Sequence, residues 1–254
     1  MTLAALDFAL SDRLHGVTAT LHPGRITAIC GPNGAGKSTL LQGLAGLLAP
    51  EGGQVRLAGA PLPSGRERAR RIGYLPQTAE IAWDVSVAAL VTLGRLPHGD
   101  SGEAHVAAAL AAVDLTDFAD RPVSTLSGGE RARALLARVL AGQPQWILAD
   151  EPLAALDLAH QLTLLARLRA AALAGAGVAL VLHDLALAMN HADWVLVLDR
   201  GRLAAEGPPE QALAEAVIAR VWGVSARWLG EPGARALIAT ASPLACGRGQ
   251  GRAC

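Results

Sequence analysis

The feature that most constrains this chain is the loop Gly31–Ser38, whose sequence GPNGAGKS fits the pattern GxxxxGK[ST]. Glycines let backbone N–H groups turn towards an anion without a Cβ in the way, and a following helix directs the positive end of its dipole at the same point. The apolar run Arg25–Cys30 precedes the loop, and Ser38–Leu48 follows it with leucines at helical spacing. This order predicts a strand, a phosphate-binding loop and a helix, which is typical of an α/β fold.

Each part of the loop has a role in holding the phosphates of a nucleotide. Lys37 reaches the β- and γ-phosphates, and the Ser38 hydroxyl is a ligand for Mg²⁺. A chance glycine-rich turn is the alternative, but the glycine spacing, the Lys-Ser pair and both flanking segments agree with a phosphate site. The predicted nucleotide-binding residues here are Gly31, Pro32, Asn33, Gly34, Ala35, Gly36, Lys37, Ser38 and Thr39.

A second apolar run, Trp146–Ala149, ends in the carboxylates of Asp150 and Glu151. Carboxylates at the C-terminal end of a buried strand lie where α/β sheets bind their ligands. We expect Asp150 to orient Mg²⁺ through water and Glu151 to polarise the attacking water, because phosphoryl transfer needs a positioned nucleophile. An acidic pair at a helix start before Pro152 is the alternative, but the phosphate loop favours the catalytic interpretation.

Strands and helices alternate through most of the chain. Val178–Leu182 is a continuous apolar run typical of a buried strand, and Leu158–Leu173 has the length and pattern of a helix. From about residue 79 to about residue 143 the pattern is mostly helical, which indicates an insertion. These patterns predict an α/β fold with a mainly parallel sheet and an inserted α-helical subdomain. The last residues, 241–254, have too little apolar content to fold alone and are predicted to be a disordered tail.

Residues Leu126–Glu130, LSGGE, narrow this general class to one family. They resemble the signature LSGGQ of the ABC ATPases, with Glu130 in the last position. A serine followed by two glycines at a helix start is itself an anion nest, and Ser127 as the N-cap of a helix over Gly129–Ala141 is a compatible alternative. The resemblance implies that this motif closes over the γ-phosphate bound by a second copy of the chain, in a head-to-tail dimer. The residues concerned are Ser127, Gly128, Gly129 and Glu130.

Four other positions resemble functional elements of the family, and the resemblance implies their roles. Gln77 looks like the Q-loop glutamine that touches Mg²⁺ and senses the membrane partner. Asp157 looks like the D-loop aspartate, with Ala155 where serine is more usual. His183 resembles the switch histidine that contacts the γ-phosphate, with a core histidine as the alternative. Phe8 lies where the family places an aromatic that stacks on adenine, although a core phenylalanine fits nearly as well.

The resemblance covers most of the chain and implies a complete activity. Residues 1–240 would form a single ABC ATPase domain, with a P-loop NTPase (RecA-like) core, an N-terminal antiparallel β region and the helical subdomain. The domain would bind ATP and Mg²⁺ and hydrolyse ATP, with Gln77, Glu151, Asp157 and His183 as its catalytic residues. In this family the cassette drives an integral-membrane permease. We therefore expect a peripheral subunit at the cytoplasmic face of the inner membrane.

Less specific motifs favour one subfamily of importers. Leu93–His98, LGRLPH, resembles the GRxPH segment of ATPases that import iron–siderophore, haem and vitamin B12 complexes, and Val221–Val224 resembles part of their C-terminal region. A polar loop between helices is the alternative for Arg95 and His98. Such an importer would also cooperate indirectly with a periplasmic or extracellular binding protein. The cargo stays open, because it contacts the permease and the binding protein and not this chain.

Composition limits the competing functions. Lys+Arg and Asp+Glu both number 22, so the chain has no excess positive charge for binding nucleic acid. The three cysteines form no CxxC pair, and no apolar run reaches the roughly 18 residues that span a bilayer. An ABC ATPase acting on ribosomes or DNA is the alternative, but neither a second cassette nor a long coiled-coil insertion is present in the sequence. An exporter is a further alternative, although many exporters fuse the cassette to membrane helices.

Overall fold

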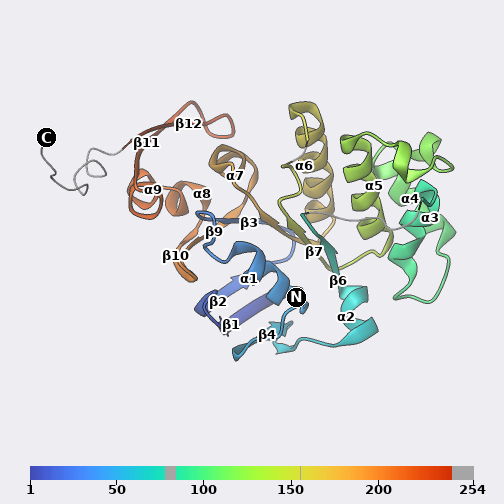
Figure 1. Ribbon diagram of the computed structural model, residues 1–254, viewed down its shortest axis with the longest axis horizontal. Helices are drawn as coiled ribbons and strands as arrows, with labels where there is room; N and C mark the ends of the chain where they lie inside the picture. Colours follow the sequence, from blue (N-terminus) through green and yellow to red (C-terminus); the bar gives the residue numbers. More distant parts are fainter. Residues whose placement is uncertain (78–83, 155, 242–254) are drawn as a thin grey trace, which may run out of the picture.

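The computed structural model describes residues 1–77, 84–154 and 156–241. Figure 1 shows two sheets with a helix between them, a group of helices at one end and a β-hairpin at the other. The predicted tail beyond residue 241, residues 79–83 of the predicted insertion and Ala155 lie outside the described residues. The arrangement is the predicted α/β fold, with a mainly parallel core sheet, an N-terminal antiparallel sheet and a helical subdomain.

The larger sheet has six strands in the order β10-β9-β3-β8-β7-β6. Its pairs are parallel, except for the edge pair β9 and β10, which a tight turn at Gly201 connects. The strands β3, β7 and β8 are buried along their whole length, which explains their continuous apolar sequences. The bounds are β3 Ile26–Cys30, β6 Ile72–Leu75, β7 Trp146–Asp150, β8 Gly177–Val181, β9 Trp194–Asp199 and β10 Arg202–Gly207.

Successive residues of these strands point to opposite faces of the sheet, so the molecule has two hydrophobic cores. Trp146 and Leu148 of β7 join the core that contains α1 (Lys37–Leu44). Ile147 of the same strand joins the other core, together with α6 (Leu158–Leu173) and α7 (Leu185–His191). Because helices cover both faces, the carboxyl ends of the strands are the open edge at which a ligand site can form.

The N-terminal sheet lies over the outer side of α1 (Figure 1). Its strands follow the order β2-β1-β4-β5 and pair antiparallel. Helix α1 is shorter than the predicted helix over Ser38–Leu48, because the chain turns at Gly46, which has a φ of 68°. The bounds of the strands are β1 Leu3–Leu10, β2 Leu14–Leu21, β4 Gly52–Leu57 and β5 Ala60–Pro61, and the short helix α2 spans Gly65–Arg71.

The helical subdomain packs three α-helices against one another. Their inward residues, such as Leu90, Leu110 and Leu136, are almost completely buried in the core shared with α6 and α7. The subdomain is inserted between β6 and β7, as the sequence predicts. Its elements are α3 Val87–Thr92, η1 Leu93–Arg95, α4 Glu103–Ala112, η2 Thr116–Phe118, η3 Val123–Thr125 and α5 Gly128–Ala141.

Gly94 allows η1 to approach the backbone of α5. A Cβ added at Gly94 would lie 2.0 Å from the carbonyl oxygen of Arg138, so the two elements would have to move apart. We expect Gly94→Ala to lower the free energy of unfolding by about 1–3 kcal/mol, as overpacking typically does. Urea denaturation measures the change. Gly52→Ala is the matched control, since its Cβ would make only an ordinary 3.5 Å contact with Ala9. Equal stabilities for the two variants would contradict the expectation.

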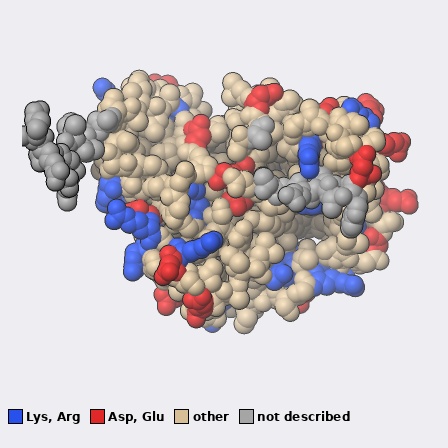
Figure 2. Space-filling model, in the orientation of Figure 1, with Lys and Arg blue, Asp and Glu red and all other residues tan. Residues whose placement is uncertain are grey.

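The C-terminal part adds elements that the sequence patterns do not predict. Two short helices, α8 (Pro209–Ala212) and α9 (Glu215–Trp222), precede a hairpin of β11 (Val224–Leu229) and β12 (Ala236–Ala241). Hydrogen bonds between Asn190 of α7 and the backbone of Arg235 attach the hairpin to the core. Figure 2 shows small groups of basic and acidic side chains interspersed on the visible face of the molecule.

Candidate functional site

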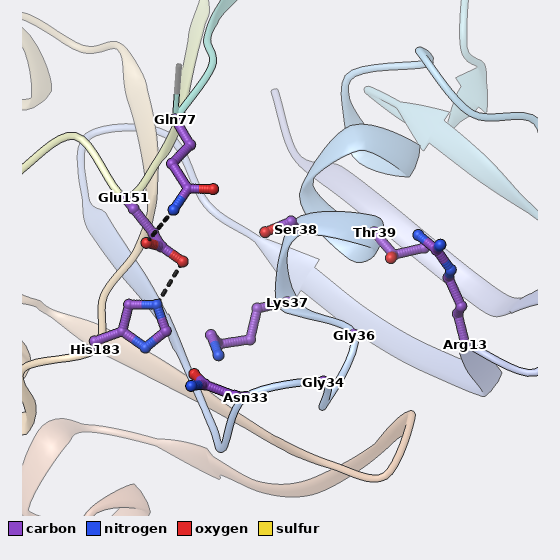
Figure 3. Close-up of a pocket in the computed structure, with 10 residues that line it drawn as sticks. All are labelled: Arg13, Asn33, Gly34, Gly36, Lys37, Ser38, Thr39, Gln77, Glu151 and His183. Carbon is purple, nitrogen blue, oxygen red and sulfur yellow. Dashed lines mark hydrogen bonds and ion pairs between the residues drawn. The ribbon is translucent and has the colours of Figure 1, made fainter. Parts of the chain in front are cut away.

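The predicted phosphate loop connects β3 to α1 and lines an open pocket of about 690 Å³ at the carboxyl edge of the large sheet. Figure 3 shows the lining residues converging on this space from the loop, from the ends of β6, β7 and β8, and from the turn between β1 and β2. The lining residues are Arg13, Asn33, Gly34, Gly36, Lys37, Ser38, Thr39, Gln77, Glu151 and His183.

Lys37 provides the positive charge in the loop. Its Nζ donates hydrogen bonds to the carbonyl oxygens of Gly31 and Pro32, both at 2.9 Å, so the ammonium group lies inside the curve of the loop. Burial lowers the pKa of Lys37, and the nearby carboxylates of Glu151 and Asp150 oppose that shift. An anion that enters the loop therefore meets a cation that is already oriented and largely shielded from water.

Glycine is required where the loop approaches its neighbours. Gly36 has a φ of 97°, and a Cβ at this position would lie 2.6 Å from Leu14 and 2.9 Å from the Arg13 carbonyl oxygen. Gly31 has a φ of 149°, and its Cβ would lie 2.2 Å from the carbonyl oxygen of Leu198. Because no larger residue fits at these two positions, the loop can keep its backbone curled around the space in front of Lys37.

Ser38 and Asp150 form an oxygen-rich pair beside the loop. The Ser38 hydroxyl donates to Oδ1 of Asp150 at 2.9 Å, and Asp150 is buried at the end of β7. Burial raises the pKa of Asp150, while the bond from Ser38 opposes that shift. Hydroxyl and carboxylate oxygens are ligands that Mg²⁺ prefers. Among the described residues, no group of three or more His, Cys, Asp or Glu side chains is arranged to hold a metal ion, so a metal here would need phosphate oxygens and water as further ligands.

Three of the predicted catalytic residues meet at one point. The Nε2 of Gln77 donates to Oε2 of Glu151 at 2.6 Å, and the Nε2 of His183 is hydrogen-bonded to Oε1 of the same carboxylate (Figure 3). Glu151 has a φ of 48°, an uncommon backbone conformation for a residue with a side chain. The carboxylate is thus held between two polar side chains at the edge of the pocket, next to Ser38 and Lys37.

Asp157 lies apart from this group. Its side chain is the N-cap of α6 and accepts hydrogen bonds from the backbone N–H of His160 at 2.9 Å and from the His160 ring at 2.8 Å. These bonds with His160 lower the pKa of Asp157. Asp157 does not line the pocket of its own chain, although it follows Glu151 closely in the sequence.

The Ser127–Glu130 segment forms a capping box at the start of α5. The backbone N–H of Glu130 donates to the Ser127 hydroxyl at 3.3 Å, and the Ser127 N–H donates to the Glu130 carboxylate at 2.7 Å. The predicted N-cap is thus confirmed. The imidazole of His160 fills the space beside Gly129, where a Cβ would lie 2.8 Å from the ring. The segment does not line the pocket around Lys37.

Comparison with known proteins identifies the family. The family model described as "ABC transporter" matches residues 14–154. The chain belongs to the ABC transporter family. The hemin import ATP-binding protein HmuV of Streptomyces coelicolor is 46% identical over 216 residues, which are 82% of this chain and 77% of that protein. The protein of the same name from Myxococcus xanthus is 44% identical over 89% of this chain and 91% of its own length.

Solved structures agree with the ABC assignment. One described as an inward-facing conformation of a metal-chelate type ABC transporter covers 96% of this chain and 99% of its own, with a TM-score of 0.82 and 25% identity. The chain is accordingly an ATP-hydrolysing subunit of the ABC transporter family. No helix among the described residues is both long enough and apolar enough to cross a membrane.

The structure contradicts the prediction that Phe8 of this ABC ATPase stacks on adenine. Phe8 is completely buried, and its ring packs on Gly43 of α1, where a Cβ would lie only 2.4 Å from the ring. A residue that stacks on adenine needs an exposed ring face, so the core alternative is the correct one. The reason is the direction of β1, which turns Phe8 towards α1 and away from the pocket. The structure instead brings Arg13 to the pocket, a residue that the motifs do not single out.

The segment that resembles GRxPH has a structural role at the end of α5. Arg95 is buried, forms a two-pronged ion pair with Asp100 at 2.8 Å and donates to the Ala141 carbonyl oxygen at 3.1 Å. The His98 ring is hydrogen-bonded to the carbonyl oxygen of Gly142 at 3.0 Å. Both side chains thus satisfy carbonyl groups at the C-terminus of the helix that begins with the ABC signature.

Proposed function

We propose that this chain is the ATP-hydrolysing subunit of an ABC importer for hemin. One observation carries the hydrolytic part: the Glu151 carboxylate lies between Gln77 and His183, at the edge of the pocket that contains Lys37. The assignment of hemin as the cargo is supported by the relatives named as hemin import proteins, which match most of the chain at 44–46% identity. Iron–siderophore and cobalamin importers are the nearest alternatives for the cargo.

The residues of the pocket divide the reaction between binding and proton transfer. The backbone of the loop and Lys37 hold the triphosphate of ATP and stabilise the charge that shifts towards the leaving phosphate. Glu151 orients a water molecule against the γ-phosphate and accepts its proton. The hydrogen bonds of Gln77 and His183 to the Glu151 carboxylate fix its direction. We expect His183 also to contact the γ-phosphate when ATP is bound. Ser38, Asp150 and Gln77 would hold Mg²⁺, which, when bound, supplies positive charge next to the β- and γ-phosphates.

The signature segment acts on a second copy of the chain. Gly128 and Gly129 begin helix α5 and present its N-terminus, yet the Ser127–Glu130 segment lines no part of the pocket in its own chain. In a head-to-tail dimer each pocket receives the Ser127–Glu130 segment of the partner, so ATP completes two sites at the shared interface. Asp157 of the D-loop faces the same interface. ATP binding then favours the dimer, and hydrolysis releases it.

The dimer would act on an integral-membrane permease. The helical subdomain offers a partly exposed apolar border, with Leu93 46% and Leu96 66% exposed. Leu93 lines a small pocket together with Tyr74 of β6, the strand that precedes Gln77. A permease helix bound at this border would change the position of Gln77. The hydrogen bond between Gln77 and Glu151 would then transmit that change to the Glu151 carboxylate. The protein would then be a peripheral subunit at the cytoplasmic face of the membrane. A periplasmic or extracellular binding protein would take part indirectly, and nucleic acid would not.

Co-purification and transport test this function. A tagged chain, solubilised gently with its membranes, is expected to retain a polytopic permease in comparable amount, identified by mass spectrometry. The purified complex, reconstituted in vesicles with its binding protein, is expected to accumulate hemin only when ATP is present. Ribosomal proteins or DNA without a permease would contradict the transport role. Uptake of cobalamin or an iron–siderophore without hemin would contradict the cargo.

A further inference from the structure

The pocket has two chemically different ends. Glu151, Gln77 and His183 lie at one end, and Arg13 and Thr39 lie on the far side of Lys37 (Figure 3). A γ-phosphate that is attacked by water must face Glu151. The purine base of the same nucleotide therefore extends towards Arg13. None of the lining residues is Phe, Tyr or Trp, so an aromatic ring is absent from the described part of this end.

The backbone of Arg13 is held firmly against the phosphate loop. Its N–H donates to the Leu10 carbonyl oxygen at 3.0 Å, in the turn between β1 and β2. Its carbonyl oxygen is so close to Gly36 and Gly201 that a Cβ at either position would lie 2.9 Å or 2.6 Å from it. The turn is thus enclosed between the phosphate loop and the β9–β10 hairpin, and the position of Arg13 relative to Lys37 is fixed.

The side chain of Arg13 is available for a ligand. It is exposed, and it makes no hydrogen bond or ion pair with any other described residue. Its guanidinium group is flat, always charged and only weakly hydrated, so it stacks readily on flat aromatic surfaces, nucleobases included. An unpaired arginine at the base end of a nucleotide pocket therefore has the geometry for stacking.

We propose that Arg13 stacks its guanidinium plane on the purine base and so determines how tightly the pocket holds the nucleoside part of its substrate. This inference rests on the proposed ATPase function and assigns to Arg13 the position that the buried Phe8 cannot fill. Stacking uses the face of the base and not its hydrogen-bonding edge. Arg13 therefore favours nucleotides over plain polyphosphates, without distinguishing adenine from guanine.

Equilibrium binding of ATP, GTP and inorganic tripolyphosphate to the nucleotide-free protein tests the proposal. We expect Arg13→Ala to raise the Kd for ATP and for GTP about tenfold and to leave the Kd for tripolyphosphate unchanged. Arg13→Lys keeps the charge but loses the plane, and we expect it to resemble Arg13→Ala. Arg13→Tyr restores a flat surface and should recover ATP binding. In ATPase assays the KM should rise while kcat stays the same.

Several outcomes would overturn the proposal. Equal weakening of ATP and tripolyphosphate, or full recovery by Arg13→Lys, would mean that Arg13 binds phosphate by charge alone. Unchanged binding in Arg13→Ala would remove the residue from the site and leave the ATPase function intact. A wild-type chain that binds tripolyphosphate but no ATP would contradict both. Arg66→Ala, an exposed arginine on α2 that does not line the pocket, controls for net charge.

Discussion

Replacing Glu151 with glutamine is expected to lower the ATPase rate by at least about 100-fold and to leave ATP bound in a stable dimer. Glutamine has nearly the same shape, and its carbonyl oxygen can still accept the hydrogen bond from Gln77. It cannot accept the proton of the attacking water. Binding and dimerisation therefore proceed, while the step that separates the two copies is blocked.

Size-exclusion chromatography with MgATP, followed by quantification of the bound nucleotide, measures this result. The variant should elute as a dimer with about one ATP per chain, whereas with ADP it should elute as a monomer. Glu103→Gln, at the start of α4 and away from the pocket, is the control for loss of one carboxylate. A Glu151→Gln variant that hydrolyses ATP at the wild-type rate would exclude Glu151 as the general base.

Two inactive variants are expected to regain activity when they are mixed. Lys37→Ala removes the cation of the phosphate loop, and Gly129→Asp places a negative charge where the signature segment would meet the γ-phosphate. An acidic residue in the first turn of α5 favours the helix dipole, so Gly129→Asp should still fold once the partly exposed His160 ring moves aside. We expect each variant alone to lose about 100-fold or more in ATPase rate.

A mixed dimer contains one site in which both defects coincide and one in which neither is present. Half of the dimers in an equal mixture are mixed, so activity should recover to about a quarter of the wild-type rate if each site works alone. The ATPase rate as a function of mixing ratio gives the measurement, with two preparations of Lys37→Ala mixed as the control. A mixture no more active than its components would mean that the signature segment does not complete the site of a partner.

The sequence predicts those parts of the site that lie within continuous motifs. The phosphate loop and the acidic end of β7 are recognisable because each needs particular residue types at neighbouring positions, next to a strand whose burial makes it continuously apolar. The capping box is local for the same reason, since Ser127 and Glu130 are three residues apart. These motifs can therefore be recognised from neighbouring residues alone, without knowledge of the distant segments that pack against them.

Other parts of the site depend on contacts between distant segments. The burial of Phe8 results from packing on Gly43, and the place of Arg13 results from contacts with Gly36 and Gly201, which no local pattern reveals. Arg95 lies in a sequence typical of a polar loop, but its side chain is hydrogen-bonded to Asp100 and to the C-terminal end of α5. The sequence patterns do not predict the C-terminal hairpin, because its short strands contain few residues with a strong preference for β-structure.

The backbone conformation of Glu151 lowers the folding stability of the protein. Its φ of 48° lies in the left-handed region, which is unfavourable for an L-residue by about 1–2 kcal/mol. Glycine would adopt the same conformation without that penalty, and asparagine with less of it. Selection for heat resistance alone would therefore favour these residues at position 151 and abolish hydrolysis. A thermostabilised form of this subunit has to gain its stability elsewhere, because full relief of the backbone strain requires glycine, which lacks the catalytic carboxylate.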